Sequence, residues 1–405
     1  MKAIVFNESI PRYVLTKILG KLKKSFYWGI LSCVKYTDIK EPKIPSGKYL
    51  KIKTIYGGIC GSDLNLITLR DSPLLSPYSS SPFVIGHENV GIVYDVSGDV
   101  EKVKKGDRVI VDPVLSCQAK EIDILCESCK KGEYSRCLNF AEKGKLSEGV
   151  IIGACSSTGG SWSEYFIAHE FQTFKLDDDI SDEEAILVDS FCSALHPVLR
   201  NFPGENEKVL IIGAGIIGIC VAISLKALKS KAKVYSLCKY EFQAERIKEY
   251  SDVIYLKENY LEKFAQITDS KILKPLLGKK FLNSGFDLIF ECTGNRDMIQ
   301  SSFGWVKPGG KIVLVGTSSI LNSIDLSFLW FREINLIGTN SSSTENYMRE
   351  KKRCYEITIN LIKEKKIDLK DLLTHKFRIK DYKKAFEANL NKKKNRLIKS
   401  AFCFK

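Results

Sequence analysis

The segment KVLIIGAGIIG at residues 208–218 constrains the fold of this chain more than any other stretch. An apolar strand pattern runs into three glycines with the spacing GxGxxG, and an apolar helix pattern follows. Such glycines let backbone amides approach a pyrophosphate at the amino end of a helix, where the helix dipole favours negative charge. The sequence therefore predicts a dinucleotide-binding turn rather than a tight turn without a ligand. The expected contacts are Gly213, Gly215, Ile216, Ile217 and Gly218.

The chain beyond this turn alternates between strand and helix patterns. Buried-strand runs occur as AKVYSLC at 232–238, FDLIFECTG at 286–294, GGKIVLVGT at 309–317 and INLIG at 334–338. This alternation predicts a parallel, doubly wound α/β sheet. The lysine-rich stretch at 256–282 is longer than a usual connection, so we expect it to hold a helix or an extra loop.

The end of the second strand bears on the choice of cofactor. An acidic residue at this place binds the ribose 2′-hydroxyl of NAD, but here Cys238 occupies it and Lys239 follows. A missing carboxylate removes repulsion of a 2′-phosphate, and a lysine can pair with one. The sequence therefore favours NADP over NAD. Gly294 and Gly316, near the ends of later strands, are expected to bring backbone close to the cofactor.

The first half of the chain has a different character. Short runs rich in Val, Ile and Tyr, broken by turns, occupy residues 49–58, 90–100 and 107–114, and they predict a compact β-rich domain. A chain of 405 residues is too long for one ordinary core and suits two domains. From about Asn340 the pattern is helical again, around residues 355–366.

Charge and hydropathy argue against several classes of partner. The net charge is +14, but the lysines are spread over the whole chain, so we expect a solvated basic surface and no nucleic-acid partner. No run of about 18 apolar residues occurs, and FYWGILSCV at 26–34 is too short to span a bilayer, so no membrane partner is expected. The N-terminus does not read as a secretory signal, which favours the cytoplasm.

Four of the thirteen cysteines are clustered in one short segment. They are Cys117, Cys126, Cys129 and Cys137, and the last three have the spacing C-x2-C-x7-C. In a reducing compartment, clustered cysteines are expected to bind a metal rather than to form disulfides. The segment 117–137 is therefore a candidate zinc lobe.

Two motifs upstream, CGSD and GHE, carry a second set of metal-binding side chains. Cys60 and His87, together with a carboxylate, can hold a catalytic zinc and leave one position open for water or substrate. Asp63 is suited to bond the ring of His87 and fix its tautomer. The hydroxyl of Ser62 can pass a substrate proton outward.

Taken together, these elements resemble the zinc-dependent medium-chain alcohol/polyol dehydrogenase family. The matching elements follow the family's order: CGSD at 60–63, GHENVG at 86–91, GDRVIVDP at 106–113, the cysteines at 117–137, GAGIIG at 213–218 and AFEANL at 385–390. The resemblance implies an α/β protein with a GroES-like, β-rich catalytic domain and a Rossmann domain with a doubly wound parallel sheet. The expected boundaries are 1–195 for the catalytic domain, 196–340 for the Rossmann domain and 341–405 for the return to the catalytic domain.

The resemblance also implies two zinc sites. One is structural and bound by the four cysteines, although the gap after Cys117 is six residues longer than the family's usual spacing. The other is catalytic, and its remaining ligand comes from the segment before the nucleotide domain. That segment, ILVDSFCSALHPV, places Asp189 at the expected position, with Cys192 as the alternative. Glu88, next to His87, could also join the metal or exchange with substrate there.

The predicted function is hydride transfer between a secondary alcohol or polyol, or the corresponding aldehyde or ketone, and NAD(P). The resemblance further implies a homodimer or homotetramer. Two other functions remain open at this point. One is a catalytically silent dinucleotide-binding protein with the same fold, although a pure binder needs no open metal site. The other is a basic zinc-lobe protein that binds nucleic acid.

Overall fold

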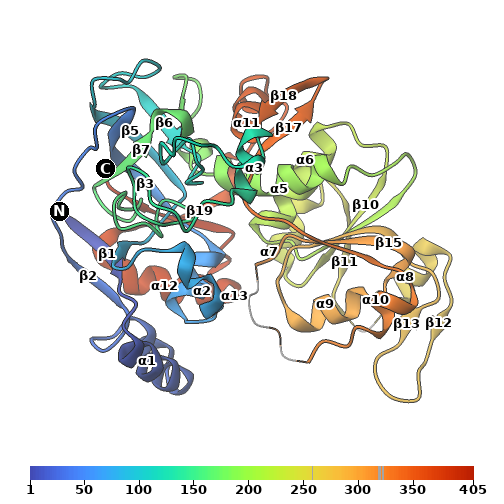
Figure 1. Cartoon of the computed structure of the whole chain (residues 1–405). Helices are drawn as coiled ribbons and strands as arrows, with labels where there is room; N and C mark the ends of the chain where they lie inside the picture. Colours follow the sequence, from blue (N-terminus) through green and yellow to red (C-terminus); the bar gives the residue numbers. More distant parts are fainter. Residues whose placement is uncertain (258, 318–320, 322) are drawn as a thin grey trace. The chain divides into compact units, whose positions relative to one another are not determined.

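The computed structural model describes residues 1–257, 259–317, 321 and 323–405, and the chain divides into two compact units (Figure 1). Unit 1 comprises Met1–Asp189 and Lys352–Lys405, and unit 2 comprises Ser190–Lys351. None of the helices in these described ranges has the length and apolar character needed to cross a bilayer.

The unit borders differ by several residues from the predicted borders at 195/196 and 340/341. Helix α5 (Val188–Arg200) runs without a break past the first border. The strands β17 (Thr344–Tyr347) and β18 (Glu350–Arg353) form a hairpin that carries unit 2 further along the chain than expected. Because a helix and a hairpin run across the unit borders, no loop or change of composition in the sequence indicates where the borders lie.

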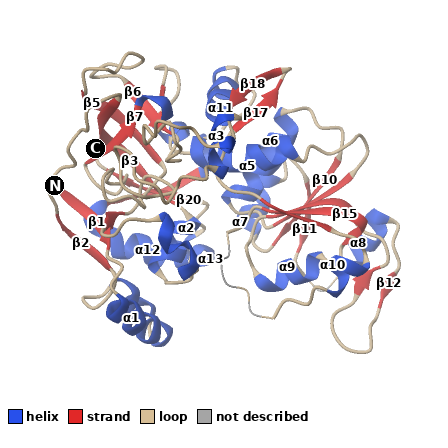
Figure 2. Cartoon of the chain, viewed as in Figure 1, coloured by secondary structure: helices blue, strands red, loops and turns tan. Residues whose placement is uncertain are grey.

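Unit 1 is built around a seven-stranded sheet with the order β19-β20-β3-β5-β6-β8, in which β7 also pairs with β3 (Figure 2). Its strands are β3 (Tyr49–Ile59), β5 (Asn89–Val96), β6 (Arg108–Val111), β7 (Tyr165–His169), β8 (Thr173–Lys175), β19 (Leu373–Arg378) and β20 (Lys399–Cys403). The β-branched and aromatic residues of β3 suit a buried, pleated surface, and Tyr49, Leu50 and Ile52 are fully buried. The predicted β-rich domain is confirmed, and β20 returns from beyond unit 2 to pair with β3.

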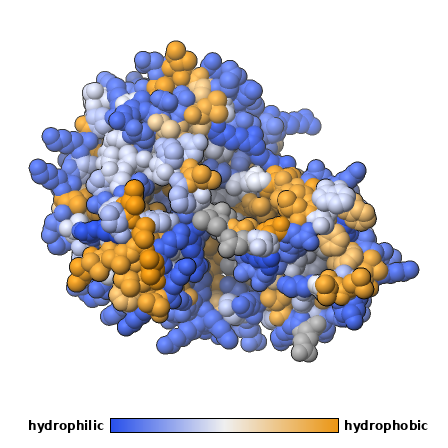
Figure 3. Space-filling view, turned by 60° about the horizontal axis from the view of Figure 1, so that its bottom comes forward, coloured by the Kyte–Doolittle hydropathy of each residue, from blue (hydrophilic) through white to orange (hydrophobic). Residues whose placement is uncertain are grey.

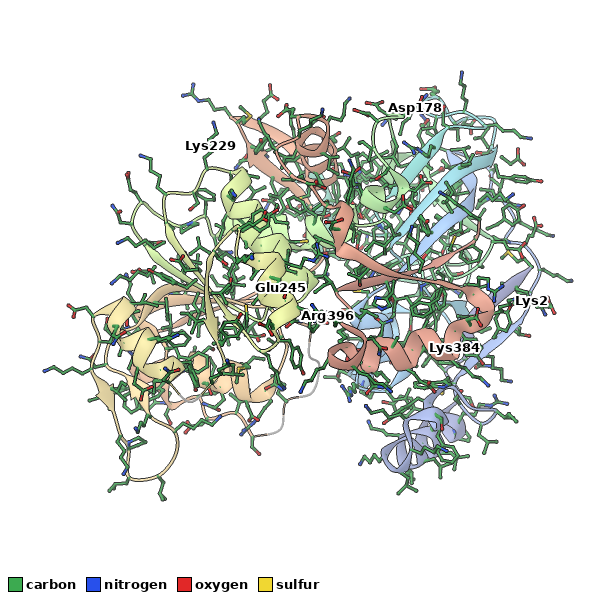
Figure 4. The ribbon with its side chains drawn as sticks, turned by 180° about the vertical axis from the view of Figure 1, so that it is seen from behind. Lys2, Asp178, Lys229, Glu245, Lys384 and Arg396 are labelled. Carbon is green, nitrogen blue, oxygen red and sulfur yellow. The ribbon has the colours of Figure 1, made fainter. Side chains whose placement is uncertain are left out.

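A smaller sheet of unit 1 has the order β2-β1-β4, and Lys2, labelled in Figure 4, is the first residue of β1. Its strands are β1 (Lys2–Phe6), β2 (Val34–Asp38) and β4 (Phe83–Val84). The helices of unit 1 are α1 (Ile10–Leu22), α2 (Gly61–Ile67), α3 (Glu127–Lys130), α4 (Asp182–Ala185), α11 (Cys354–Lys363), α12 (Tyr382–Leu390) and α13 (Lys392–Asn395). Helix α12 is held to the core by rings: Trp162 lies 5.7 Å from Phe386 and 5.1 Å from Phe402.

Unit 2 has one six-stranded parallel sheet with the order β11-β10-β9-β14-β15-β16. Its strands are β9 (Lys208–Ile212), β10 (Lys233–Cys238), β11 (Asp252–Tyr255), β14 (Phe286–Glu291), β15 (Val306–Leu314) and β16 (Asn335–Gly338). Its helices are α6 (Ile216–Ala227), α7 (Glu241–Ile247), α8 (Tyr260–Thr268), α9 (Arg296–Ser302) and α10 (Ser327–Phe331). Counted along the chain, the order is 3-2-1-4-5-6, which is the Rossmann arrangement that the sequence predicted.

The long stretch at 256–282 contains both features that were expected as alternatives. Helix α8 is followed by a hairpin of two short strands, β12 (Ile272–Leu273) and β13 (Phe281–Leu282). Position 258 of this stretch lies outside the described residues.

Candidate metal centres and cofactor site

The four clustered cysteines of unit 1 bring their sulfur atoms together. The Sγ atoms of Cys117, Cys126, Cys129 and Cys137 all lie within 4.8 Å of one another. Cys137 Sγ is 3.6 Å from Cys117 Sγ and 3.9 Å from Cys126 Sγ. Tetrahedral zinc with bonds of about 2.3 Å requires sulfur atoms about 3.8 Å apart. The donor set and its spacing therefore fit a closed zinc site.

The surroundings of Cys137 favour the thiolate form that a metal requires, whereas burial raises the pKa of Cys117 and the hydrogen bond to Cys137 raises that of Cys129. The thiol of Cys129 donates to Cys137 and lowers the pKa of Cys137 to about 5. The backbone amide of Asn139 also donates to Cys137, over 3.4 Å, and that of Leu138 donates to Cys126 over 3.4 Å. Amide donors of this kind stabilise charge on sulfur.

Two residues in the longer segment after Cys117 fix this segment to the rest of unit 1. Lys120 is fully buried and donates to the carbonyl oxygens of Asn139, Phe140 and Glu142 over 3.3, 2.7 and 3.0 Å. The next residue, Glu121, pairs with Lys145 over 2.7 Å and with His169 over 3.2 Å. These contacts hold the inserted loop in place and leave Cys117 among the other sulfurs.

A second group in unit 1 joins Cys60, His87 and Glu88, whose ligand atoms also lie within 4.8 Å of one another. Cys60 is the residue before helix α2, and its amide donates to Asp63 Oδ2 over 2.9 Å. Asp63 Oδ1 is 3.2 Å from His87 Nδ1, so the other ring nitrogen of His87 is left for a ligand. Ser62, in the first turn of α2, is half-buried.

The charge state of His87 reflects this neighbourhood. Burial lowers the pKa of His87, but the Asp63 carboxylate and the Cys60 thiol outweigh burial and hold that pKa well above 6.5. A metal ion would supply the positive charge that these neighbours favour. One thiolate, one imidazole and one carboxylate form the open donor set of a catalytic zinc.

The residue that neutralises Glu88 could not be identified from the sequence. Lys399 of β20 forms an ion pair with Glu88, and their side chains are only 3% and 1% exposed. Burial lowers the pKa of Lys399, and the Glu88 carboxylate outweighs burial and raises it. Since 311 positions separate the two residues, only the sheet pairing of β20 with β3 brings them together.

Asp189, the predicted third ligand, lies outside the group formed by Cys60, His87 and Glu88. It is half-buried at the start of α5, and its Oδ1 accepts a hydrogen bond from the Tyr355 hydroxyl over 2.5 Å. Burial raises the pKa of Asp189 to about 6, although the nearby charge of His87 opposes this. The alternative ligand, Cys192, is a buried residue of α5.

The glycine turn of unit 2 has the form that a pyrophosphate needs. Gly213 adopts a φ of +94°, which favours glycine, and Gly215 is the residue before helix α6. A Cβ on Gly218 would lie 1.9 Å from the carbonyl oxygen of Gly213, so only glycine fits there. A Cβ on Gly215 would meet no atom within 4 Å. Open space therefore lies beside the amino end of the helix, where Ile216 and Ile217 are half-buried.

The other predicted cofactor residues lie at the carboxyl ends of the strands. Cys238 ends β10 and is fully buried, which raises its pKa to about 12, whereas Lys239 is exposed. A Cβ on Gly316 would lie 2.2 Å from the amide nitrogen of Gly294, so these two glycines pack against each other. The Gly294 amide donates to Glu291 over 2.9 Å, a buried carboxylate that the sequence analysis did not single out.

Comparisons with known proteins agree with this geometry. The model of the alcohol dehydrogenase GroES-like domain matches residues 46–178, and the model of the zinc-binding dehydrogenase domain matches residues 217–355. The chain is 27% identical to L-idonate 5-dehydrogenase of Vitis vinifera, over 88% of this chain and 89% of that protein. It is 26% identical to D-xylulose reductase of Saccharomyces cerevisiae, over 87% and 89%, and 29% identical to L-threonine 3-dehydrogenase of Shewanella baltica, over 84% and 88%.

Solved structures share the fold over the whole chain. The alcohol dehydrogenase of Aeropyrum pernix superposes with a TM-score of 0.74 at 18% identity and covers 100% of both chains. The 2R,3R-butanediol dehydrogenase of Bacillus subtilis gives 0.71 at 22% identity, with 100% of this chain and 99% of that chain covered. The chain therefore belongs to the zinc-dependent medium-chain dehydrogenase family and is an NAD(P)-dependent alcohol or polyol dehydrogenase.

Proposed function

We propose that this chain oxidises a small secondary alcohol or polyol at a zinc held by Cys60, His87 and Glu88, and that it prefers NADP as hydride acceptor. The observation that carries the proposal is the convergence of these three donors within 4.8 Å in unit 1. Glu88 takes the role that the sequence analysis gave to Asp189, because its carboxylate belongs to the converging group. Asp189 is then a nearby half-buried acid that accepts a hydrogen bond from Tyr355.

The side chains around these donors have distinct tasks. When bound, zinc supplies a Lewis acid for the substrate oxygen, and the nicotinamide supplies the hydride acceptor. Asp63 holds Nδ1 of His87 and thereby orients the other ring nitrogen. Lys399 balances the charge of Glu88. Ser62, in the first turn of α2, moves the substrate proton towards solvent.

The second zinc is proposed to be structural. Cys117, Cys126, Cys129 and Cys137 leave no position open, so this site holds the lobe together and takes no part in the reaction.

The preference for NADP rests on the end of β10. Cys238 carries no charge that would repel a 2′-phosphate, and the exposed Lys239 can pair with one. Lys239→Glu should weaken NADPH binding by roughly tenfold or more and leave NADH binding within about twofold. Lys229→Glu, which reverses an exposed charge elsewhere in unit 2, is the matched control. If both cofactors weakened equally in Lys239→Glu, the proposed contact with a 2′-phosphate would be wrong.

The names of the relatives support a proposal for the substrate class. Threonine, idonate and xylulose, which appear in the names of these relatives, each carry a secondary hydroxyl beside another polar group. We propose a substrate of the same kind, a secondary alcohol with a neighbouring hydroxyl or amino group. A panel of such compounds should give higher kcat/KM than simple primary alcohols of the same length.

The first experiment is metal analysis of protein purified without chelator, together with fluorescence titration of NADPH and NADH. We expect two zinc ions per chain and tighter binding of NADPH. Cys60→Ser should lose one zinc ion and all activity, with the cofactor still bound. Full zinc content and full activity in Cys60→Ser would refute the catalytic site.

The resemblance to the family also supports a proposal for the location, the oligomeric state and the partners of the enzyme. We propose a cytoplasmic homodimer or homotetramer with a small-molecule substrate and no nucleic-acid partner. Light scattering after gel filtration should give two or four times the mass of 45.7 kDa. Salt-dependent binding to DNA or RNA at physiological ionic strength would contradict the last part.

A further inference from the structure

Helix α1 of unit 1 presents an apolar face to solvent. Ile10, Val14, Ile18 and Leu22 recur every four residues, which places them on one side of a helix. Their exposed fractions are 79%, 51%, 58% and 80%, and Leu15 beside them is 39% exposed. Figure 3 shows hydrophobic residues gathered on this side of unit 1. Within the described residues, nothing covers this face.

The opposite side of α1 is fixed to the body of unit 1. Thr16 and Gly20 are buried, and a Cβ on Gly20 would lie 2.3 Å from the ring of Tyr27. Tyr13 and Tyr27 pack against the core cluster that contains Trp28. The exposed apolar side is therefore held outward by a well-packed base. Helix α1 is therefore packed against the core through its other side, and the exposed apolar side is not a core-facing side of a detached helix.

The charge of this segment selects the kind of partner. Residues 9–34 contain five basic residues and no Asp or Glu. With 100° per residue, Lys17 and Lys21 lie along one border of the apolar face and Arg12 lies along the other. An apolar face bordered by cations is the pattern of helices that lie in the interface of anionic membranes. A second copy of the chain would bring ten cations together without an acidic residue to balance them.

We propose that residues 10–31 dock this protein reversibly on an anionic lipid surface. The apolar face of α1 enters the interface between headgroups and acyl chains, and Lys17, Lys21 and Lys24 contact lipid phosphates and carboxylates. Ile30 and Leu31, which are 94% and 54% exposed, extend the apolar surface beyond the helix. The absence of a sequence run long enough to span a bilayer led to the expectation of no membrane partner, but docking on a lipid surface requires no spanning segment.

Unit 2 carries a second exposed segment that combines apolar and cationic side chains. The turn between β12 and β13 exposes Leu276 and Leu277 by 104% and 92%. Residues 271–282 contain four lysines and no acidic residue. Two apolar side chains at the tip of a cationic hairpin are also suited to an anionic interface. This hairpin supports the same partner independently of α1.

The test is sedimentation of the full-length protein with vesicles. One set contains phosphatidylcholine alone, and the other contains phosphatidylcholine with phosphatidylserine. We expect at least tenfold tighter binding to the second set, and weakening as salt is raised. Binding that is absent, or equal for both sets, would overturn the proposal.

Variants assign the binding to the helix. Ile18→Glu/Leu22→Glu should bind at least tenfold more weakly, and Lys21→Glu/Lys24→Glu should lose roughly fivefold per residue at low salt. Met348→Glu, at a position 74% exposed in the β17–β18 turn, and Lys229→Glu are matched controls that should bind as the natural protein does. Dehydrogenase activity and zinc content, measured in solution, confirm that each variant is folded.

Two further outcomes would overturn the proposal. If Ile18→Glu/Leu22→Glu sedimented with vesicles as strongly as the natural protein, α1 would not be the contact. If the same variant lowered the oligomeric mass in solution and the natural protein bound no lipid, the apolar face would join two copies of the chain. A Leu276→Glu/Leu277→Glu variant measures the contribution of the hairpin in the same assay.

Discussion

Arg353 carries the most informative test of the packing in unit 1. Its guanidinium lies over three aromatic rings, at 5.2 Å from Tyr134, 4.6 Å from Phe171 and 4.8 Å from Phe174. It also pairs with Asp112 over 2.6 Å, and the Asp112 side chain is only 2% exposed. We predict that Arg353→Met destabilises the protein mainly because it leaves this carboxylate buried without a cation.

The size of the effect follows from the proton that can replace the cation. Burial raises the pKa of Asp112 above its ordinary value of 3.8, and Arg353 opposes this rise. Without Arg353 the folded state can hold Asp112 neutral, at a cost of about 1.36 kcal/mol per pH unit above 3.8. The ceiling is therefore about 4 kcal/mol at pH 7 and about 1.6 kcal/mol at pH 5. Loss of the ring contacts adds about 1–2 kcal/mol at either pH.

The stability of the Arg353→Met variant depends on pH through the protonation of Asp112. In the variant the folded state binds one proton more than the unfolded chain, so its free energy of unfolding falls as pH rises above 3.8 and stops falling at the raised pKa. The variant should therefore approach the stability of the natural protein as pH falls from 7 to 5. The double variant Arg353→Met/Asp112→Asn removes the titrating group and should lose this pH dependence.

The assay is urea unfolding followed by tryptophan fluorescence at pH 5 and pH 7. With a slope of about 2–3 kcal/mol per M, we expect the midpoint of Arg353→Met to fall by roughly 1–2 M at pH 7. Arg353→Lys, which keeps the charge but loses the planar contacts, is the control and should lose about half as much or less. An equal loss at both pH values would refute the reasoning about Asp112.

Three further predictions concern the sites. Gly218→Ala places a methyl group about 1.9 Å from the Gly213 oxygen, so titration should show NADPH binding weakened at least tenfold with zinc content unchanged. Cys137→Ser should lose one zinc ion by mass spectrometry and lower Tm by roughly 10 °C, while an unchanged Tm would argue against a structural role. Lys399→Met removes the cation that pairs with the buried Glu88 carboxylate and should cost about 3–5 kcal/mol in urea unfolding, whereas Lys399→Met/Glu88→Gln should recover more than half of that cost.

Much of the fold could be predicted because its signals are local. The strands β3, β5, β9, β10, β14 and β16 fall within or close to the runs identified from their Val, Ile and aromatic content. The glycine turn could be placed between a strand and a helix because each glycine answers a local steric demand, as Gly213 and Gly218 do. The proposed metal donors Cys60 and His87 stood in short motifs and were readable for the same reason.

The residues that complete the site could not be predicted, because their partners are distant in the sequence. Lys399 was one lysine among many until β20 placed it beside Glu88. Tyr355 likewise bonds Asp189 only through the packing of α11 in unit 1. Helix α1 was not predicted, for a different reason. Periodic apolar residues normally indicate the buried face of a helix, but those of α1 face solvent.

The position of β20 has a consequence for how the chain is made. Unit 2 is continuous in the sequence, so its sheet can form before translation of the chain is complete. Unit 1 cannot, because β20 lies between β19 and β3 and leaves the ribosome only after all of unit 2. Until then the nascent unit exposes the edge of β3, and Glu88 has no cation beside it. We therefore expect the incomplete unit 1 to need a chaperone until β20 has been made. A chain that stops before β20 should be degraded rather than folded.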